Sequence, residues 1–132
     1  NGTDYIFLIE MAGLRIAHFG DIGQDALTEE QLAILGKIDI AVMQFENSYS
    51  AMDTINKKGF TMMDQVKPRL IIPTHIKEAA VKLLAQKWPV LYSEQQFITV
   101  DSVELGASTR VIFLGSKSKS WADLVGAIKI NW

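Results

Sequence analysis

Two nearly continuous apolar runs constrain the fold of this chain more than any other feature. Residues 38–45 read IDIAVMQF, and residues 69–73 read RLIIP. Apolar side chains at almost every position of a strand indicate burial on both faces, as in sheets covered by helices. Helical patterns flank these runs at residues 28–36 (TEEQLAILG) and 77–88 (KEAAVKLLAQKW). We therefore predict an α/β protein with a mixed sheet.

The remaining elements complete this α/β pattern. A hairpin is predicted from residues 4–10 (DYIFLIE) and 14–19 (LRIAHF), with Gly13 in the tight turn. Thr28 and Gln31 form a capping-box pattern at the start of the first helix. Further predictions are a helix at residues 48–68 that Gly59 divides, and short strands at residues 90–92, 96–100 and 109–115, the last two joined through residues 105–108.

The chain is predicted to form one domain with a short appended segment. Residues 1–115 contain the α/β pattern, and we expect residues 116–132 to be a linker followed by a C-terminal docking segment. Within that segment, residues 120–125 read as a helix with an N-cap pattern. Residues 127–132 (AIKINW) alternate apolar and polar side chains, so an edge strand is the alternative there.

Composition narrows the class of protein. The formal net charge is −2, and the scattered lysines do not form the basic patch of a nucleic-acid binder. No apolar run reaches the roughly 18 residues of a membrane span, and the N-terminus lacks a signal-peptide pattern. We expect a cytoplasmic protein that binds neither membrane nor nucleic acid. The chain has no cysteine, which excludes thiolate zinc ligands, and it begins at Asn1, which indicates processing, trimming or a piece of a longer protein.

Polar residues with metal-binding chemistry follow two of the predicted strands. His18 and Asp21 come after LRIA, and His75 follows RLIIPT. The carboxyl ends of strands are where α/β proteins gather functional groups, and carboxylate and imidazole ligands suit Zn²⁺, Mn²⁺ or Fe²⁺. A structural role is the alternative, because a histidine at a strand end often only makes a hydrogen bond and an aspartate beside glycine is a common turn former.

Three segments, in this order, resemble the C-terminal half of the metallo-β-lactamase-fold hydrolases. They are GLRIAHFGDIG (13–23), LTEEQLAILGKIDIAVM (27–43) and VKPRLIIPTHI (66–76), and the resemblance extends over residues 4–87. The branch they most resemble includes the zinc-dependent, ascorbate-6-phosphate lactonase-like proteins. The resemblance implies half of an αββα sandwich, with a mixed sheet and helices on one face.

The resemblance also implies roles for three residues. Asp21 stands where the family has its metal-bridging, catalytic aspartate, and His75 stands where it has its last metal-binding histidine. His18 precedes the aspartate at a position that is often histidine in this branch, either as a metal ligand or as a neighbour of the site. The implied metal is zinc, with manganese or iron as alternatives. The implied reaction is hydrolysis of a lactone, phosphodiester or related ester-like bond by metal-activated water.

A loop departs from the family pattern. Residues 44–53 read QFENSYSAMD, where the branch usually has a Pro-x-Gly-Gly loop. This difference indicates an altered or lost substrate pocket, and the residues that bind substrate are unknown. We expect a solvated loop in which Ser50 caps the next helix. The alternative is a set of polar contacts from Glu46, Asn47 and Tyr49.

A second departure is the missing part of the metal site. The family's His-x-His-x-Asp-His cluster lies in its N-terminal half, and no segment here matches it. Asp21 and His75 alone cannot complete a zinc site, which takes about four ligands. Half a sandwich would also leave one apolar sheet face exposed. The expected partners are therefore the N-terminal half or a second copy in a homo-oligomer, and a small-molecule substrate. The alternative function is a non-catalytic binding or scaffold domain without a complete metal site.

Overall fold

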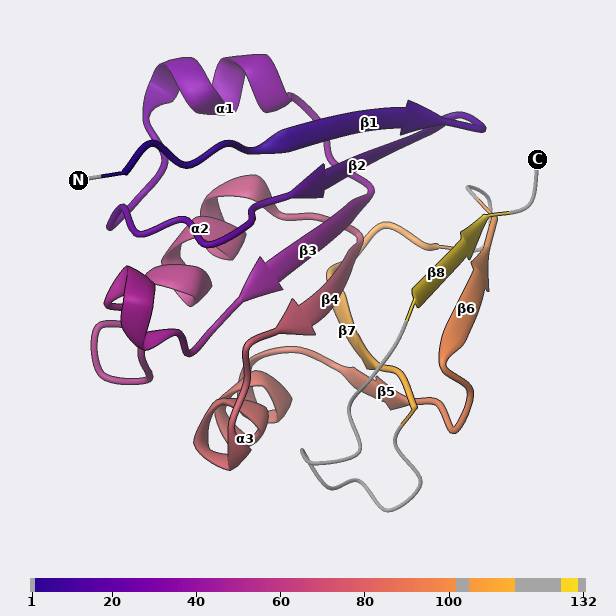
Figure 1. Ribbon diagram of the computed structural model, residues 1–132. Coiled ribbons are helices and arrows are strands. Elements are labelled where there is room, and N and C mark those ends of the chain that lie inside the picture. Colours follow the sequence, from indigo (N-terminus) through magenta and orange to yellow (C-terminus); the bar gives the residue numbers. More distant parts are fainter. Residues whose placement is uncertain (1, 102–104, 116–126, 131–132) are drawn as a thin grey trace.

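The computed structural model describes residues 2–101, 105–115 and 127–130 (Figure 1). Within these residues the chain forms a six-stranded sheet, a two-stranded sheet and three α-helices. In this part of the chain, no helix is long and apolar enough to cross a membrane. The elements in chain order are β1 (Phe7–Met11), β2 (Leu14–His18), α1 (Glu29–Leu35), β3 (Ile40–Gln44), a 3₁₀ turn η1 (Ser48–Ser50), α2 (Lys58–Val66), β4 (Leu70–Thr74), α3 (Glu78–Lys87), β5 (Val90–Tyr92), β6 (Phe97–Val100), β7 (Arg110–Phe113) and β8 (Ala127–Ile130).

The six-stranded sheet is mixed, as the sequence predicts. Its strand order is β1-β2-β3-β4-β7-β5, with β1 antiparallel to β2 and the other neighbours parallel. The β1–β2 hairpin turns at Gly13, whose φ of +76° suits glycine. In the centre of the sheet, Ala17 pairs with Ala41, and Ala41 pairs with Ile71. The carboxyl ends of β2, β3 and β4 therefore lie at the same edge of the sheet.

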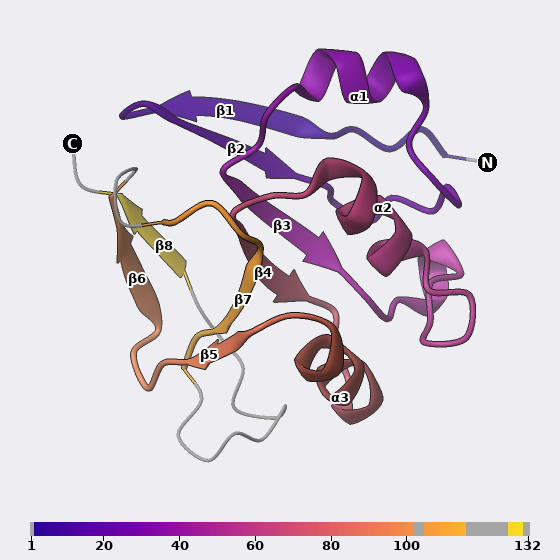
Figure 2. The same cartoon turned by 180° about the vertical axis from the view of Figure 1, so that it is seen from behind.

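The three α-helices cover one face of this sheet, and Figure 2 shows the molecule from that side. Leu35 of α1, Met63 of α2 and Leu84 of α3 belong to one buried core with Ala41 and Ile71 of the sheet. The predicted capping box is also present at the start of α1. This arrangement confirms the expected α/β fold with helices on one face of a mixed sheet.

The opposite face of the sheet is covered only in part. A second buried core joins Val100 of β6 and Leu105 to sheet residues that include Leu70. At the β1 edge of the same face, Phe7 and Ile9 remain 61% and 42% exposed. The expectation of a fully uncovered face is therefore wrong for the region near Leu70, because β6 and the residues after it pack there.

The strands predicted at residues 96–100 and 109–115 are both present, and they belong to different sheets. β6 pairs with β8 in parallel, whereas β7 inserts between β4 and β5 (Figure 1). The hydroxyl of Thr109 donates to the Pro68 carbonyl at 2.6 Å, which ties the start of β7 to the start of β4. β8 confirms the strand alternative for part of the C-terminal segment. The helix predicted at residues 120–125 lies outside the described residues.

The single helix predicted at residues 48–68 is two separate elements. η1 is a short turn, and α2 begins several residues later. Between them, the Asp53 carboxylate accepts hydrogen bonds from the N–H groups of Ile55 and Asn56. Local bonds of this kind compete with helical hydrogen bonding. These bonds of Asp53 interrupt the predicted helix between η1 and α2. Gly59 does not divide the helix, because it lies inside α2.

Candidate functional site

Asp21 and His75 lie close together at the sheet edge where β2, β3 and β4 end. Asp21 is in the loop after β2, His75 directly follows β4, and β3 runs between these two strands. Oδ1 of Asp21 is 3.9 Å from Nε2 of His75, and the two side chains are 59% and 52% exposed. This distance is longer than a hydrogen bond. The structure therefore brings together two residues that lie 54 positions apart, the difference between 75 and 21.

Polar side chains at the end of β3 and just after it hold Asp21 in place. Asn47 Nδ2 donates to Asp21 Oδ1 at 3.1 Å, and Ser50 Oγ donates to the Asp21 carbonyl at 2.6 Å. Gln44 lies behind both of them. Its Nε2 donates to Ser50 Oγ at 3.2 Å, and its Oε1 accepts from Asn47 Nδ2 at 2.7 Å. All three side chains are buried, so hydrogen bonds inside the protein fix both the backbone and the carboxylate of Asp21.

Glu46, in the loop after β3, holds the turn that contains His75. His75 has a φ of +43°, which is uncommon for a residue other than glycine. The Glu46 N–H donates to the His75 carbonyl at 2.7 Å, and the Glu46 carboxylate accepts from the Lys77 N–H at 2.7 Å. Glu46 therefore bonds to the chain on both sides of Ile76 and holds the turn between β4 and α3.

Residues 44–50 contact both Asp21 and His75, and we call them the clamp loop. The sequence predicted a solvated loop in which Ser50 caps the next helix. That prediction is wrong, because Ser50 is buried and donates to Asp21, while α2 begins after Lys57 without a side-chain cap. The partners of the clamp loop lie on other loops at the same sheet edge, and a local pattern does not reveal them.

Of the three polar contacts considered as the alternative for this loop, two are present. Glu46 and Asn47 make the hydrogen bonds described above, whereas the Tyr49 side chain is 99% exposed. The sequence did hold a signal for the buried members. Gln44, Asn47 and Ser50 recur at every third position, starting from the last residue of a buried strand. Amide and hydroxyl groups buried at such positions need hydrogen-bond partners, and the neighbouring strand ends supply them.

His18 ends β2 and has a different role from that of the pair. Its Nδ1 accepts a hydrogen bond from the Gly20 N–H at 3.0 Å. In the neutral ring the hydrogen then resides on Nε2. Within the described residues, His18 makes no bond to Asp21 or His75. It supports the turn in which Gly20, with a φ of +56°, leads the chain toward Asp21.

The Asp21–His75 pair fits part of a zinc site. Two ligand atoms on a tetrahedral zinc lie about 3.4 Å apart, because each bond is about 2.1 Å long. The observed Oδ1–Nε2 distance of 3.9 Å is close to that separation, and both atom types are zinc ligands. The described part of the chain contains no group of three or more His, Cys, Asp or Glu residues placed to hold a metal. A metal held by this pair would therefore need further ligands.

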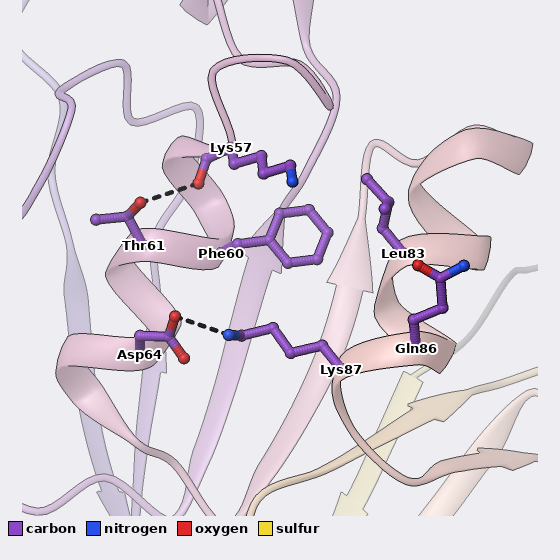
Figure 3. A pocket seen from close by; sticks show the side chains of 7 residues that line it. All are labelled: Lys57, Phe60, Thr61, Asp64, Leu83, Gln86 and Lys87. Atoms are coloured by element: carbon purple, nitrogen blue, oxygen red, sulfur yellow. Dashed lines mark hydrogen bonds and ion pairs between the residues drawn. The ribbon is translucent and has the colours of Figure 1, made fainter.

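A separate hollow lies between α2 and α3, in the helix layer (Figure 3). Phe60 lies in its interior, and an ion pair between Asp64 and Lys87, at 2.9 Å, crosses one end. It shares no lining residue with the Asp21–His75 pair or the clamp loop, so it is distinct from the strand-end site. The full lining consists of Lys57, Phe60, Thr61, Asp64, Leu83, Gln86 and Lys87.

Comparison with known proteins gives two similarities. Residues 1–75 match the family model of the β-lactamase superfamily domain. Among solved structures, the fold is similar to that of a Thermotoga maritima protein assigned to the zinc-dependent hydrolases of the metallo-β-lactamase superfamily, with 20% identity and a TM-score of 0.58. The match covers 81% of this chain and 57% of that protein, so the chain spans little more than half of its length. No curated protein matches the sequence.

Proposed function

The chain belongs to the β-lactamase superfamily, and on this premise we propose that its strand-end site is part of the metal centre of a hydrolase. Asp21 and His75 would be two of the metal ligands. The observation that carries the proposal is the 3.9 Å separation of Asp21 Oδ1 and His75 Nε2, which come from two different loops. The clamp loop adds support, because it bonds to both residues from the strand end between them.

Zinc is the metal that the donor set suits best, with manganese or iron as alternatives. A bound metal would supply a Lewis acid and would acidify water. The Asp21 carboxylate would offset part of the metal's charge, and the neutral His75 ring would provide a nitrogen ligand. Both side chains are about half exposed, at 59% and 52%, so further ligands and a substrate can approach them.

The substrate class follows from the three segments that resemble the lactonase-like branch. We propose a small molecule with a lactone, phosphodiester or related ester-like bond. Such substrates have a polarised carbonyl or phosphoryl oxygen that a Lewis acid can bind. The Tyr49 side chain, two residues beyond Asn47 in the chain, is exposed and is available to contact such a molecule.

The remaining ligands would come from a second half of the sandwich. The sheet face opposite the helices is the surface that this half would cover, and Phe7 and Ile9 are exposed there. We propose the N-terminal half of the superfamily domain as the partner, with a second copy of this chain as the alternative. Either partner would bury the exposed apolar side chains while completing the metal site.

A non-catalytic binding or scaffold domain is the second candidate. The observation that favours it is the clamp loop itself, which has polar side chains bonded to Asp21 where the family has a glycine-rich loop. In this case the fold would persist without a functional metal centre. Metal binding distinguishes the two candidates, because only the first requires a metal at Asp21 and His75.

Zinc titration followed by NMR tests the proposal. The chain has two histidines, so the ring signals of His18 serve as an internal reference for those of His75. We expect zinc to shift the His75 signals more than the His18 signals, with weak affinity because two protein ligands leave most of the shell to water. The variant Asp21→Ala should reduce the zinc-dependent shift of His75 by about tenfold or more at a given zinc concentration, by loss of a ligand.

The same titration has a clear contrary outcome. If millimolar zinc leaves the His75 signals unchanged, or moves both histidines equally in the native chain and in Asp21→Ala, the metal centre is refuted and the scaffold candidate is favoured. His18→Ala is the matched control, because among the described residues the His18 side chain bonds only to the Gly20 N–H. This variant should leave the zinc affinity at His75 unchanged.

A further inference from the structure

We propose that Asn47 is a positioning residue for this site: it holds the Asp21 carboxylate in the orientation in which it binds the metal. The inference rests on the proposed function and adds to it a residue from the loop that departs from the family pattern. Asn47 would not touch the metal or the substrate. It would act through Asp21, to which its side chain donates a hydrogen bond.

The Asn47 side chain has each of its hydrogen-bonding groups engaged. Nδ2 donates to Asp21 Oδ1 at 3.1 Å and to Gln44 Oε1 at 2.7 Å. Oδ1 accepts from the Tyr49 N–H at 3.1 Å. An amide bonded in this way cannot flip without facing a donor with a donor and an acceptor with an acceptor. Asn47 is 7% exposed, so the lost bonds would not readily be replaced by water.

Gln44 and Ser50 extend these bonds into a ring that begins and ends at Asp21. Gln44 Nε2 donates to the Ile22 carbonyl at 2.8 Å, and a carbonyl can only accept, so the orientation of the Gln44 amide is determined. The same nitrogen donates to Ser50 Oγ, which donates to the Asp21 carbonyl. Asp21 is therefore tied to the end of β3 through its backbone and through its carboxylate.

The two carboxylate oxygens of Asp21 have different surroundings in this ring of hydrogen bonds. Oδ1 accepts from Asn47 and faces Nε2 of His75 at 3.9 Å, whereas Oδ2 has no hydrogen-bond partner among the described residues. A buried polar network that ends on a half-exposed carboxylate limits the rotation of that carboxylate. Residues that orient metal ligands in this way typically contribute about 10–100-fold to metal affinity.

The test compares zinc affinity at His75, measured by NMR, in the native chain and in Asn47→Ser. Serine keeps an oxygen that can cap the Tyr49 N–H, but its side chain is too short to reach Asp21. We expect zinc affinity to fall about tenfold or more, with the circular dichroism spectrum unchanged. Asn56→Ala is the matched control, because within the described part of the chain the Asn56 side chain bonds only to backbone groups of residues 51–58. This control should keep the native affinity.

A double-mutant cycle separates positioning from a general loss of structure. In an Asp21→Ala background, Asn47→Ser should cause no further loss of affinity, because the residue through which it acts is gone. An equal loss in both backgrounds, or a native affinity in Asn47→Ser, would overturn the inference and leave the proposed function standing. If the native chain shows no zinc effect at His75, the proposed function fails, and the inference fails with it.

Discussion

Buried polar side chains lie at both ends of the parallel strands, and their roles differ between the two ends. At the carboxyl ends, Asn47 and its neighbours bond to the exposed carboxylate of Asp21. At the amino ends, Asp39 accepts a hydrogen bond from the Arg15 N–H at 2.8 Å and pairs with the Arg69 guanidinium at 3.0 Å. The group around Asp39 connects the starts of β2, β3 and β4. It holds no exposed carboxylate of the kind that could bind a metal, so we infer that its role is to stabilise the fold.

Replacing Asp39 should destabilise the fold without affecting the metal site. The Asp39 and Arg69 side chains are 12% and 16% exposed, so Asp39→Ala removes a largely buried charge partner and an acceptor for a backbone N–H. We expect the free energy of unfolding to fall by about 2–4 kcal/mol, measured by urea denaturation. The control Glu78→Ala removes only an exposed ion pair with Lys82 and should cost less than about 0.5 kcal/mol. Equal losses in the two variants would contradict this assignment.

At the scale of elements, the packing of α2 against β3 depends on a glycine. A Cβ added at Gly59 would lie 2.5 Å from the Gln44 carbonyl oxygen and 3.1 Å from the Phe45 ring. This close approach brings α2 against the strand from which the clamp loop begins. Gly59 therefore allows α2 to pack closely against β3. It does not break the helix, because α2 continues on both sides of it.

The variant Gly59→Ala should be less stable than the native chain, although alanine favours helices. Helix propensity alone would stabilise the variant by about 1 kcal/mol. The contact with the rigid β3 backbone should outweigh this gain and cost about 1–3 kcal/mol overall. Thermal unfolding followed by circular dichroism measures the difference. Gly2→Ala is the control, because no atom lies within 4 Å of a Cβ there, and a higher melting temperature for Gly59→Ala would refute this packing argument.

At the scale of the whole molecule, the two faces of the large sheet differ in how well they are covered. The helices seal one face, whereas β6 and the residues near Leu105 cover only part of the other. Side chains of residues 6–9, at the start of β1, alternate accordingly: Ile6 and Leu8 pack on the helix-side core, and Phe7 and Ile9 are exposed on the opposite face. An apolar edge of this kind is the surface that a second half of the sandwich would occupy.

We predict that the purified chain self-associates through this face when no other partner is present. Static light scattering should give an average mass above that of the 14.7 kDa monomer at high concentration. The double variant Phe7→Ser, Ile9→Thr should remain monomeric, because it removes the apolar side chains that association would bury. Ile34→Thr is the control, since Ile34 is 66% exposed on α1 in the helix layer. A native chain that stays monomeric at high concentration would contradict the need for a covering partner.

Periodicity and turn residues predicted most of the strands and helices in their order, and they placed Asp21 and His75 at strand ends. These features depend on periodicity and on turn residues, which act over a few neighbouring positions. The proximity of Asp21 and His75 also followed from the sequence. Both residues come after strands, and the carboxyl ends of parallel strands share one edge of the sheet. The resemblance to the metallo-β-lactamase fold rests on the same segments of the sequence.

The role of the clamp loop and the pairing of β6 depend on contacts between distant segments, which the fold alone provides. Asn47 and Asp21 are 26 residues apart, and the polar pattern of residues 44–50 suits a solvated loop equally well until its partners are known. β6 likewise pairs with β8, although β7 lies between them in the chain. In both cases the energy comes from hydrogen bonds and packing between distant segments, and local preferences of the chain do not contain that information.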